Sequence, residues 1–230
     1  NGIQVGQILP ASAGWRQAPD STTIRDGKAD SSDPSQKVAM VGRPGGGVYV
    51  AYVVGYPTAR FIRVLNVVTG ATLDVPGSAN ADAVAMSAEP DGRLWITWEQ
   101  GGKVKAVHTN AAATQLGSIG TWGAPRGTEY LWNSTIAGAP GGASLVYTAT
   151  TQNAINVWHT NVTRTLTVKG SPGTARRGSG VTFTVTDAGD PVAGATVRFG
   201  SRTATTNGSG RATINAPGSS GRVKATAKKG

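Results

Sequence analysis

The stretch "VAMSAEPDGRLWITW", Val84–Trp98, closely repeats an earlier part of the chain. Val38–Tyr52 reads "VAMVGRPGGGVYVAY", with the same Val-Ala-Met opening, a Pro-Gly turn and an alternating run of aromatic and β-branched residues. A third copy, "STIAGAPGGASLVY" at Ser134–Tyr147, keeps the Pro-Gly-Gly turn and the apolar strand that follows it. An internal repeat of this kind determines the architecture, because each copy folds as the same supersecondary unit.

The spacing of the copies gives the size of that unit. The turn prolines Pro44, Pro90 and Pro140 are 46 and 50 residues apart. An independent echo agrees with this period, since "KAVHTN" at Lys105–Asn110 returns as "NVWHTN" at Asn156–Asn161. Each unit reads as strand, hairpin, strand, loop, strand and a weaker outer strand. Four strands in about 45 to 50 residues is the size of one β-propeller blade.

The alternation within the copies predicts which residues pack. Successive side chains of a strand point to opposite faces of the sheet. In "VYVAY" and "LWITW" both faces are largely apolar, which indicates strands enclosed between neighbouring sheets. We therefore interpret Tyr49, Tyr52, Trp95 and Trp98 as packing residues of a radial core rather than as ligand platforms.

Over residues 3–162 the repeated units resemble the blades of bacterial sialidase-like and Asp-box propellers. The resemblance is architectural, because "EPDGRLW" departs from the Asp box, Ser-x-Asp-x-Gly-x-Thr-Trp, in having Asp91 next to Gly92. Three repeats are visible, whereas propellers usually close with about 4–8 blades. In addition, "IQVGQIL" at Ile3–Leu9 resembles the outer strand that ends the second repeat. We expect a fragment of a larger propeller, or one of several chains that complete one another, with residues 10–36 as a long connection.

After Thr163 the character of the sequence changes. The chain alternates strictly and carries turn signals about every 8–12 residues, which is typical of a β-sandwich. Strands are predicted around Val168, over Val181–Val185 and over Ala195–Phe199. The dipeptide Asn207–Gly208 within "TNGSGRATI" predicts a two-residue hairpin turn.

This second region resembles bacterial Ig-like and carboxypeptidase-regulatory-like β-sandwich modules over residues 164–229. The motifs that carry the resemblance are "PVAGATV" and "TNGSGRATI". The resemblance implies a spacer, an adhesin unit or an adaptor domain, and it implies one more strand after "GRVKATAKKG" than the sequence holds. A missing edge strand would expose unpaired backbone and invite a partner strand.

The net charge of +10 is concentrated in this second region. Residues 1–162 carry 11 Lys and Arg against 10 Asp and Glu, and residues 163–230 carry 11 against 2, which gives +1 and +9. So basic a domain attracts polyanions such as wall polymers, acidic polysaccharide or nucleic acid, although a solvated exterior has the same composition. Its aromatic residues, Phe183 and Phe199, fall on inward positions, which argues against stacking on single-stranded nucleic acid. The candidate polyanion-binding residues are Arg176, Arg177, Arg198, Arg202, Arg211, Arg222, Lys224, Lys228 and Lys229.

Composition excludes several chemistries. The chain has no cysteine, which removes disulfides, thiol catalysis and Cys-ligated metals. The histidines His108 and His159 occupy matching positions of two repeats, and we interpret them as strand residues whose imidazoles bond a loop. We predict no bound metal and no organic cofactor. The alternative is a calcium ion in the "DGKADSSD" loop at Asp26, Asp30 and Asp33. No run of about 18 apolar residues occurs, so we expect no membrane span.

The sialidase-like resemblance also raises the question of catalysis. It implies three arginines that grip a carboxylate, a Tyr–Glu nucleophile pair and an aspartic acid. None of the family's catalytic motifs can be transferred residue by residue, so we predict no catalytic residue. The candidates that this alternative leaves are the acids Glu89, Asp91, Glu99 and Glu129, the last beside Tyr130, and the arginines Arg43, Arg60, Arg63, Arg93 and Arg126.

These observations predict a two-domain, all-β protein. Residues 1–162 would form a partial β-propeller of about three blades, and residues 163–230 an Ig-like β-sandwich. We expect a bacterial extracellular or cell-surface protein in a binding, adhesive or structural role, engaging glycans, cell-wall polymers or neighbouring protein subunits, other copies included. Two alternatives stay open. One is a fragment of a sialidase-like glycosidase whose catalytic groups lie in other blades, and the other is a surface fibre subunit completed by a donated strand.

Overall fold

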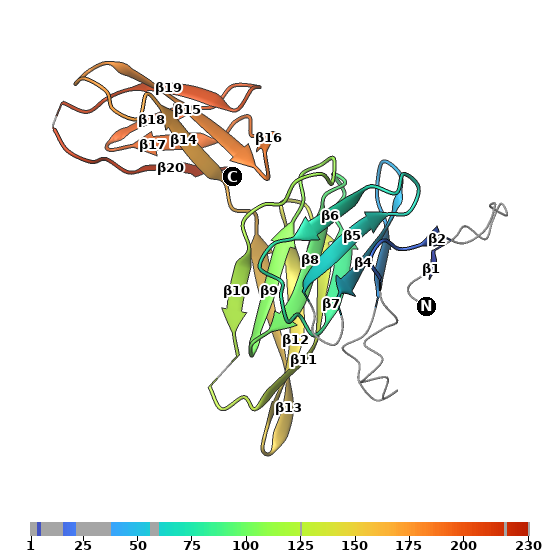
Figure 1. Cartoon of the computed structure of the whole chain (residues 1–230). Coiled ribbons are helices and arrows are strands. Elements are labelled where there is room, and N and C mark those ends of the chain that lie inside the picture. The colour runs from blue at the N-terminus through green and yellow to red at the C-terminus, as the bar shows by residue number, and fades with distance from the viewer. Residues whose placement is uncertain are drawn as a thin grey trace. The chain divides into compact units, whose positions relative to one another are not determined.

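The computed structural model describes residues 4–5, 16–21, 38–55, 60–124, 126–218 and 220–229. The described residues form strands and turns without a helix, which confirms the prediction of an all-β chain. It follows that no described segment is a long apolar helix of the kind that crosses a membrane. The chain divides into two compact units, Asn1–Thr163, called the N-terminal unit, and Arg164–Gly230, called the C-terminal unit (Figure 1).

Three antiparallel sheets, each with its strands in chain order, make up most of the described N-terminal unit. The first sheet holds β3 (Ala39–Gly42), β4 (Val48–Val54), β5 (Phe61–Asn66) and β6 (Thr72–Val75). The second holds β7 (Val84–Ala88), β8 (Leu94–Gln100), β9 (Lys103–His108) and β10 (Gly120–Gly123). The third holds β11 (Tyr130–Ala139), β12 (Gly142–Thr151) and β13 (Ala154–Thr163). A short pair, β1 (Gln4–Val5) and β2 (Arg16–Gln17), precedes them; the rest of the predicted connection at residues 10–36 lies mostly outside the described residues.

The repeated turns lie at equivalent places in the three sheets, as the period predicts. Pro44 lies between β3 and β4, Pro90 between β7 and β8, and Pro140 between β11 and β12. The glycines that follow provide the left-handed backbone of a tight turn, for example Gly141 with φ 80°. The expectation of four strands in each repeat is not met in the third sheet, whose described part has three strands. The chain leaves β13 at Thr163 and passes directly into the C-terminal unit.

Packing on both faces explains the apolar alternation of the central strands. Tyr49 and Trp98 lie in a core cluster shared by the first and second sheets. Trp95 and the third sheet's Leu145 belong to a second cluster, formed by the opposite face of the second sheet. Tyr52 points to the other side of the first sheet, into a cluster with Ala18. The four aromatic side chains are at most 5% exposed, which confirms that they are packing residues.

The C-terminal unit contains two small sheets around one core. One sheet is built from β14 (Thr167–Ser171), β15 (Gly180–Asp187), β16 (Asp190–Pro191) and β19 (Arg211–Asn215), with β15 in the centre. The other has the order β18 (Arg202–Thr205), β17 (Thr196–Phe199), β20 (Ala225–Lys228). Their inward side chains, such as Phe183, Val197 and Ile214, form a single hydrophobic cluster between the layers. The strands predicted around Val168, Val181–Val185 and the end of Ala195–Phe199 are confirmed.

The predicted two-residue hairpin at Asn207–Gly208 is wrong. The strands on either side of it, β18 and β19, belong to different sheets, so this turn carries the chain from one layer to the other. Asn207 shapes it with its side chain, whose Oδ1 accepts the backbone N–H groups of Ser209 and Arg211 at 3.0 Å each. Gly210 has φ 69°, and a Cβ there would lie 2.6 Å from the carbonyl oxygen of Val185. The glycine that matters is therefore Gly210, because β15 approaches it closely.

Candidate functional site

The C-terminal unit holds a pocket of about 760 Å³ at one end of its two sheets. The pocket is bordered by the connection from β14 to β15, by the end of β17 and by the connection from β19 to β20. These segments come from both layers, so the pocket lies where the sandwich opens at its end. The lining residues that bear on function are Arg176, Arg177, Val181, Phe183, Phe199 and Arg222.

The apolar part of the lining is continuous with the core of the unit. Phe183 is 3% exposed, and its ring centroid lies 5.0 Å from that of the half-buried Phe199. Gly170 makes room for this pair, because a Cβ at that position would lie 2.9 Å from the ring of Phe183. The pocket therefore offers an apolar wall through the half-buried Phe199, with Phe183 behind it in the core, against which the carbon face of a sugar ring can pack.

Two of the three arginines stand on a turn with a fixed backbone. The N–H of Ser179 donates to the carbonyl oxygen of Arg176 at 3.0 Å, and Gly178 has φ 77° at the third position. This pattern is that of a type II turn, in which glycine is favoured at that place. The turn is tied to the end of β19, because Ala216 donates its N–H to Ser179 and accepts that of Gly178. Arg176 and Arg177 thus project from an anchored support.

The third arginine comes from a distant part of the sequence. Arg222 lies in the connection from β19 to β20 and is exposed, as are Arg176 and Arg177. Among the described residues no ion pair involves these three arginines, and none of the pocket's lining residues is acidic. A guanidinium presents a planar fork of N–H donors that matches carboxylate, phosphate or sulfate oxygens. The arrangement can therefore bind an anionic group beside the apolar wall.

The negative charges of this unit lie at the opposite end of β15. Its acidic residues are Asp187 and Asp190, at the end of that strand and in β16, whereas the pocket borders the strand's beginning at Val181. At about 3.3 Å per residue, six residues place Asp187 some 20 Å along the strand from Val181. Asp187 is also buried and pairs with Arg164 at 3.4 Å. The acidic residues of the unit therefore lie away from the pocket.

The structure divides the nine predicted polyanion-binding residues into groups. Arg176, Arg177 and Arg222 come together at the pocket. Two others bind backbone carbonyls of the fold: Arg198 donates to Gly200 at 3.0 Å, and Arg202 donates to Asn215 at 2.9 Å, joining the two layers. The remaining four are exposed, on or beside the strands β19 and β20: Arg211, Lys224, Lys228 and Lys229.

Sequence reasoning missed the apolar partners of the arginines. Phe183 and Phe199 were assigned to the core by alternation, which is correct, yet they also line the pocket. Alternation shows on which face a side chain lies, but not that the two layers separate at one end. The neighbouring loop prolines, Pro172 and Pro217, are the local signal, because they prevent the strands from continuing past the pocket.

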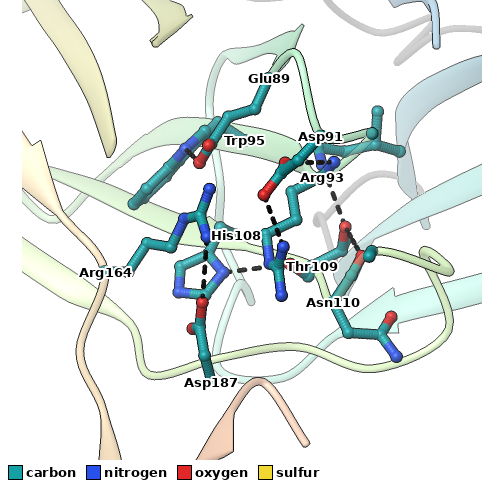
Figure 2. Close-up of polar contacts among 12 residues, drawn as sticks. Glu89, Asp91, Arg93, Trp95, His108, Thr109, Asn110, Arg164 and Asp187 are labelled. Carbon is teal, nitrogen blue, oxygen red and sulfur yellow. Dashed lines mark hydrogen bonds and ion pairs between the residues drawn. The ribbon is translucent and has the colours of Figure 1, made fainter. Parts of the chain in front are cut away.

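Two candidate acids of the glycosidase alternative, Glu89 and Asp91, are shown with their contacts in Figure 2. Glu89 is fully buried and accepts the indole N–H of Trp95 at 2.6 Å, and Asp91 pairs with Arg93 at 2.6 Å. Glu99 accepts the backbone N–H of Ser134 at 2.7 Å. Burial raises the pKa of Glu99, while the contacts with Ser134 act in the opposite direction.

The fourth candidate acid and the candidate arginines show a similar local organisation. Glu129 is exposed and its backbone N–H donates to Thr150. Arg43 donates from Nε to the carbonyl oxygen of Gly92 at 2.8 Å, which links the hairpins of the first and second sheets. Arg63 forms ion pairs with Asp20 and Asp74. These contacts of Arg43 and Arg63 connect sheets and turns of the N-terminal unit. Arg60 and Arg126 are exposed.

The two histidines are strand residues, as predicted, but their surroundings differ. His108 is 1% exposed, packs at 4.9 Å from the ring of Trp95, and has its Nδ1 3.1 Å from the carbonyl oxygen of Thr109. His159 in β13 is exposed. Within the described ranges no group of three or more His, Asp or Glu side chains is placed to hold a metal ion. The alternative calcium loop at Asp26, Asp30 and Asp33 lies outside the described residues.

Comparison of the sequence with protein-family models and with curated proteins finds no match.

Proposed function

We propose that this chain is a binding protein whose C-terminal unit takes up an anionic polysaccharide or cell-wall polymer at the arginine-lined pocket. The observation that carries the proposal is the convergence of Arg176, Arg177 and Arg222 on one pocket that has no acidic lining residue. Phe199, backed by the buried Phe183, supplies the apolar wall for the sugar ring. The arginines supply the donors for its carboxylate, sulfate or phosphate group.

The distribution of the other cations favours a polymer over a single small anion. Lys169 and Arg211 both face Thr184 across neighbouring strands, so they form a row on the outer face of one sheet. Lys228 lies on the outer face of the other sheet. A chain that enters the pocket with one anionic group can follow either row with the next groups. The charge of +9 on residues 163–230 would also attract such a polymer over a distance at low salt.

We further propose that the N-terminal unit is part of a β-propeller, that the C-terminal unit is an Ig-like sandwich, and that the protein acts outside the cell or at its surface. The equivalent Pro-Gly hairpins and the face-to-face clusters of the three sheets support the propeller. Two layers that share one core support the sandwich. In this arrangement the stacked sheets serve as a scaffold, and the basic module provides the contact with the polymer.

The test compares two triple variants of the full chain that each remove three positive charges. One is Arg176→Ala, Arg177→Ala, Arg222→Ala, and the matched control is Lys169→Ala, Arg211→Ala, Lys228→Ala on the sheet faces. The probe is polygalacturonate, with uncharged dextran as the negative polymer. Affinity is measured by calorimetry or by retardation in an affinity gel at several salt concentrations.

We expect the pocket variant to lose about tenfold or more in affinity. The slope of log affinity against log salt should become shallower by about 2, because fewer counterions are released when fewer contacts form. The control should lose clearly less at the same net charge. Equal losses of affinity in both variants would show that the polymer responds to the overall charge and not to the pocket. A wild-type chain that does not bind polygalacturonate at low salt would refute the proposal.

A further inference from the structure

One face of the third sheet carries exposed aliphatic side chains beside polar ones, among them Thr148, which pairs with Val157, and His159. Ile155 and Val157 of β13 are 74% and 70% exposed, and Val146 of β12 shares their face because it pairs with His159. The strands β11, β12 and β13 contain no Asp, Glu, Lys or Arg. Exposed aliphatic side chains that gather on one face of a sheet mark a candidate interaction site.

The second sheet shows what covers such a face in this fold. The motifs "KAVHTN" and "NVWHTN" align Val104 with Ile155 and Ala106 with Val157. Val104 and Ala106 are at most 1% exposed, because they belong to the cluster in which the third sheet packs on the second. Equivalent residues are thus buried in one repeat and open in the next. The exposed face is therefore equivalent to one that another β-sheet covers.

We propose that this face binds the same face of a second copy of the chain, across a two-fold axis. The opposite end of the stack is largely covered: Tyr52 and Val54 are at most 1% exposed, within a cluster that includes Ala18, while Met40 stays exposed at 71%. Head-to-tail stacking, whether it closes into a ring or continues into a filament, would need that covered face. Two-fold pairing uses the open face twice and closes at the dimer.

The charges of the chain are compatible with this pairing. A two-fold interface brings each residue near its own counterpart, so a charged face would repel itself. The third sheet avoids this repulsion, since its three strands hold no ionised Asp, Glu, Lys or Arg, and nearly all of the net charge of +10 lies in residues 163–230. Association should accordingly persist at high salt, where apolar contact is not screened.

The experiment measures the oligomeric state of the full chain by sedimentation velocity and light scattering over a range of concentrations and salt. Val157→Lys places a charge on the proposed interface. Val68→Lys is the matched control, because Val68 is 68% exposed in the turn between β5 and β6. Met40→Lys charges the opposite end of the stack. Circular dichroism checks the fold of each variant, and Val157→Thr, which keeps the β-branched shape, replaces the lysine variant if that one fails to fold.

We expect a concentration-dependent dimer in the wild type, in Val68→Lys and in Met40→Lys, and a rise of about tenfold or more in the dimer's Kd for Val157→Lys. Val157→Thr should raise the Kd by a smaller factor. A wild type that stays monomeric at every concentration overturns the proposal, and so does a Val157→Lys variant that dimerises like the control. Filaments that Met40→Lys dissolves would show head-to-tail stacking instead.

Discussion

The two units of this chain differ in how they use aromatic residues and charge. All six tryptophans and all five tyrosines lie in residues 1–163, while residues 164–230 contain two phenylalanines as their aromatic residues. The positive charge is distributed in the opposite way, with +1 on residues 1–162 and +9 on residues 163–230. The stacked sheets pack large aromatic side chains between them, whereas the small sandwich fills its core mainly with Val, Ala and Ile around Phe183 and has a cationic surface. The two units therefore differ in composition, with aromatic packing in one and a cationic surface in the other.

The largest expected effect comes from removing one core residue from each unit, which tests whether the two units unfold independently. Trp98 is fully buried between the first and second sheets, and Ile214 is 5% exposed in the core of the sandwich. We expect Trp98→Ala to lower the unfolding free energy of the N-terminal unit by about 3–5 kcal/mol, and Ile214→Ala to lower that of the C-terminal unit by about 2–5 kcal/mol.

Each change should leave the other unit's transition in place, because the chain divides into two compact units. Tryptophan fluorescence reports on the N-terminal unit alone, since all six tryptophans lie there, and calorimetry follows both units. If either variant shifts both unfolding transitions, the two units unfold as one cooperative body, and the prediction of independent units is wrong.

A smaller effect tests how closely the repeated sheets approach one another. Gly42 and Gly138 occupy the same place in their repeats, two residues before Pro44 and Pro140. A Cβ at Gly138 would lie 2.7 Å from the carbonyl oxygen of Ala88 in the neighbouring sheet, while a Cβ at Gly42 would have nothing within 4 Å. We expect Gly138→Ala to cost about 1–3 kcal/mol in the N-terminal unit, because the obstacle is backbone and has to move.

Gly42→Ala is the control for that variant. It makes the same chemical change at the equivalent position and should be neutral or slightly stabilising, because alanine restricts the unfolded chain. Denaturant unfolding followed by tryptophan fluorescence measures both. Equal effects of the two substitutions would contradict the close approach of the third sheet to the backbone of Ala88 in the second sheet.

These cases show how far the sequence reaches. The repeat predicted the equivalent hairpins, and the alternation predicted that Trp95 and Trp98 are core residues, because both signals are local and periodic. The difference between Gly42 and Gly138 cannot be read from the sequence, since it depends on whether another sheet packs against the face on which the glycine lies. Likewise the basic composition named Arg176 and eight others, but only the fold brings three of the nine to one pocket.

The failed prediction of a hairpin has the same origin. The Asn207–Gly208 dipeptide is a strong hairpin signal between strands that pair, and here its flanking strands belong to different sheets. The exposed face of Ile155 and Val157 reads in the sequence like the buried face of Val104 and Ala106, because the pattern is the same in both repeats. Local pattern therefore specifies each sheet, and the order of the sheets decides which face stays open.

The smallest expected effect uses pH to distinguish the two units through Tyr52. Burial raises the pKa of the Tyr52 phenol to about 12, although the neighbouring Arg63 guanidinium lowers it. The unfolded phenol titrates near 10, so between about pH 10 and 12 the unfolded state releases its proton first and the N-terminal unit loses stability as pH rises. At about pH 8 both states are protonated, and Tyr52→Phe should cost about 1 kcal/mol, because the hydroxyl donates to the carbonyl oxygen of Pro19 at 2.7 Å. At about pH 11 this advantage of the wild type should shrink by about 1 kcal/mol, since phenylalanine has no proton to lose.

The C-terminal unit contains no tyrosine, and its transition in the same samples records the general effect of alkaline solution. A difference between wild type and Tyr52→Phe that stays constant from pH 8 to 11 would show that the phenol is not desolvated in the folded unit, and that the cluster around Ala18 does not seal this end of the stack.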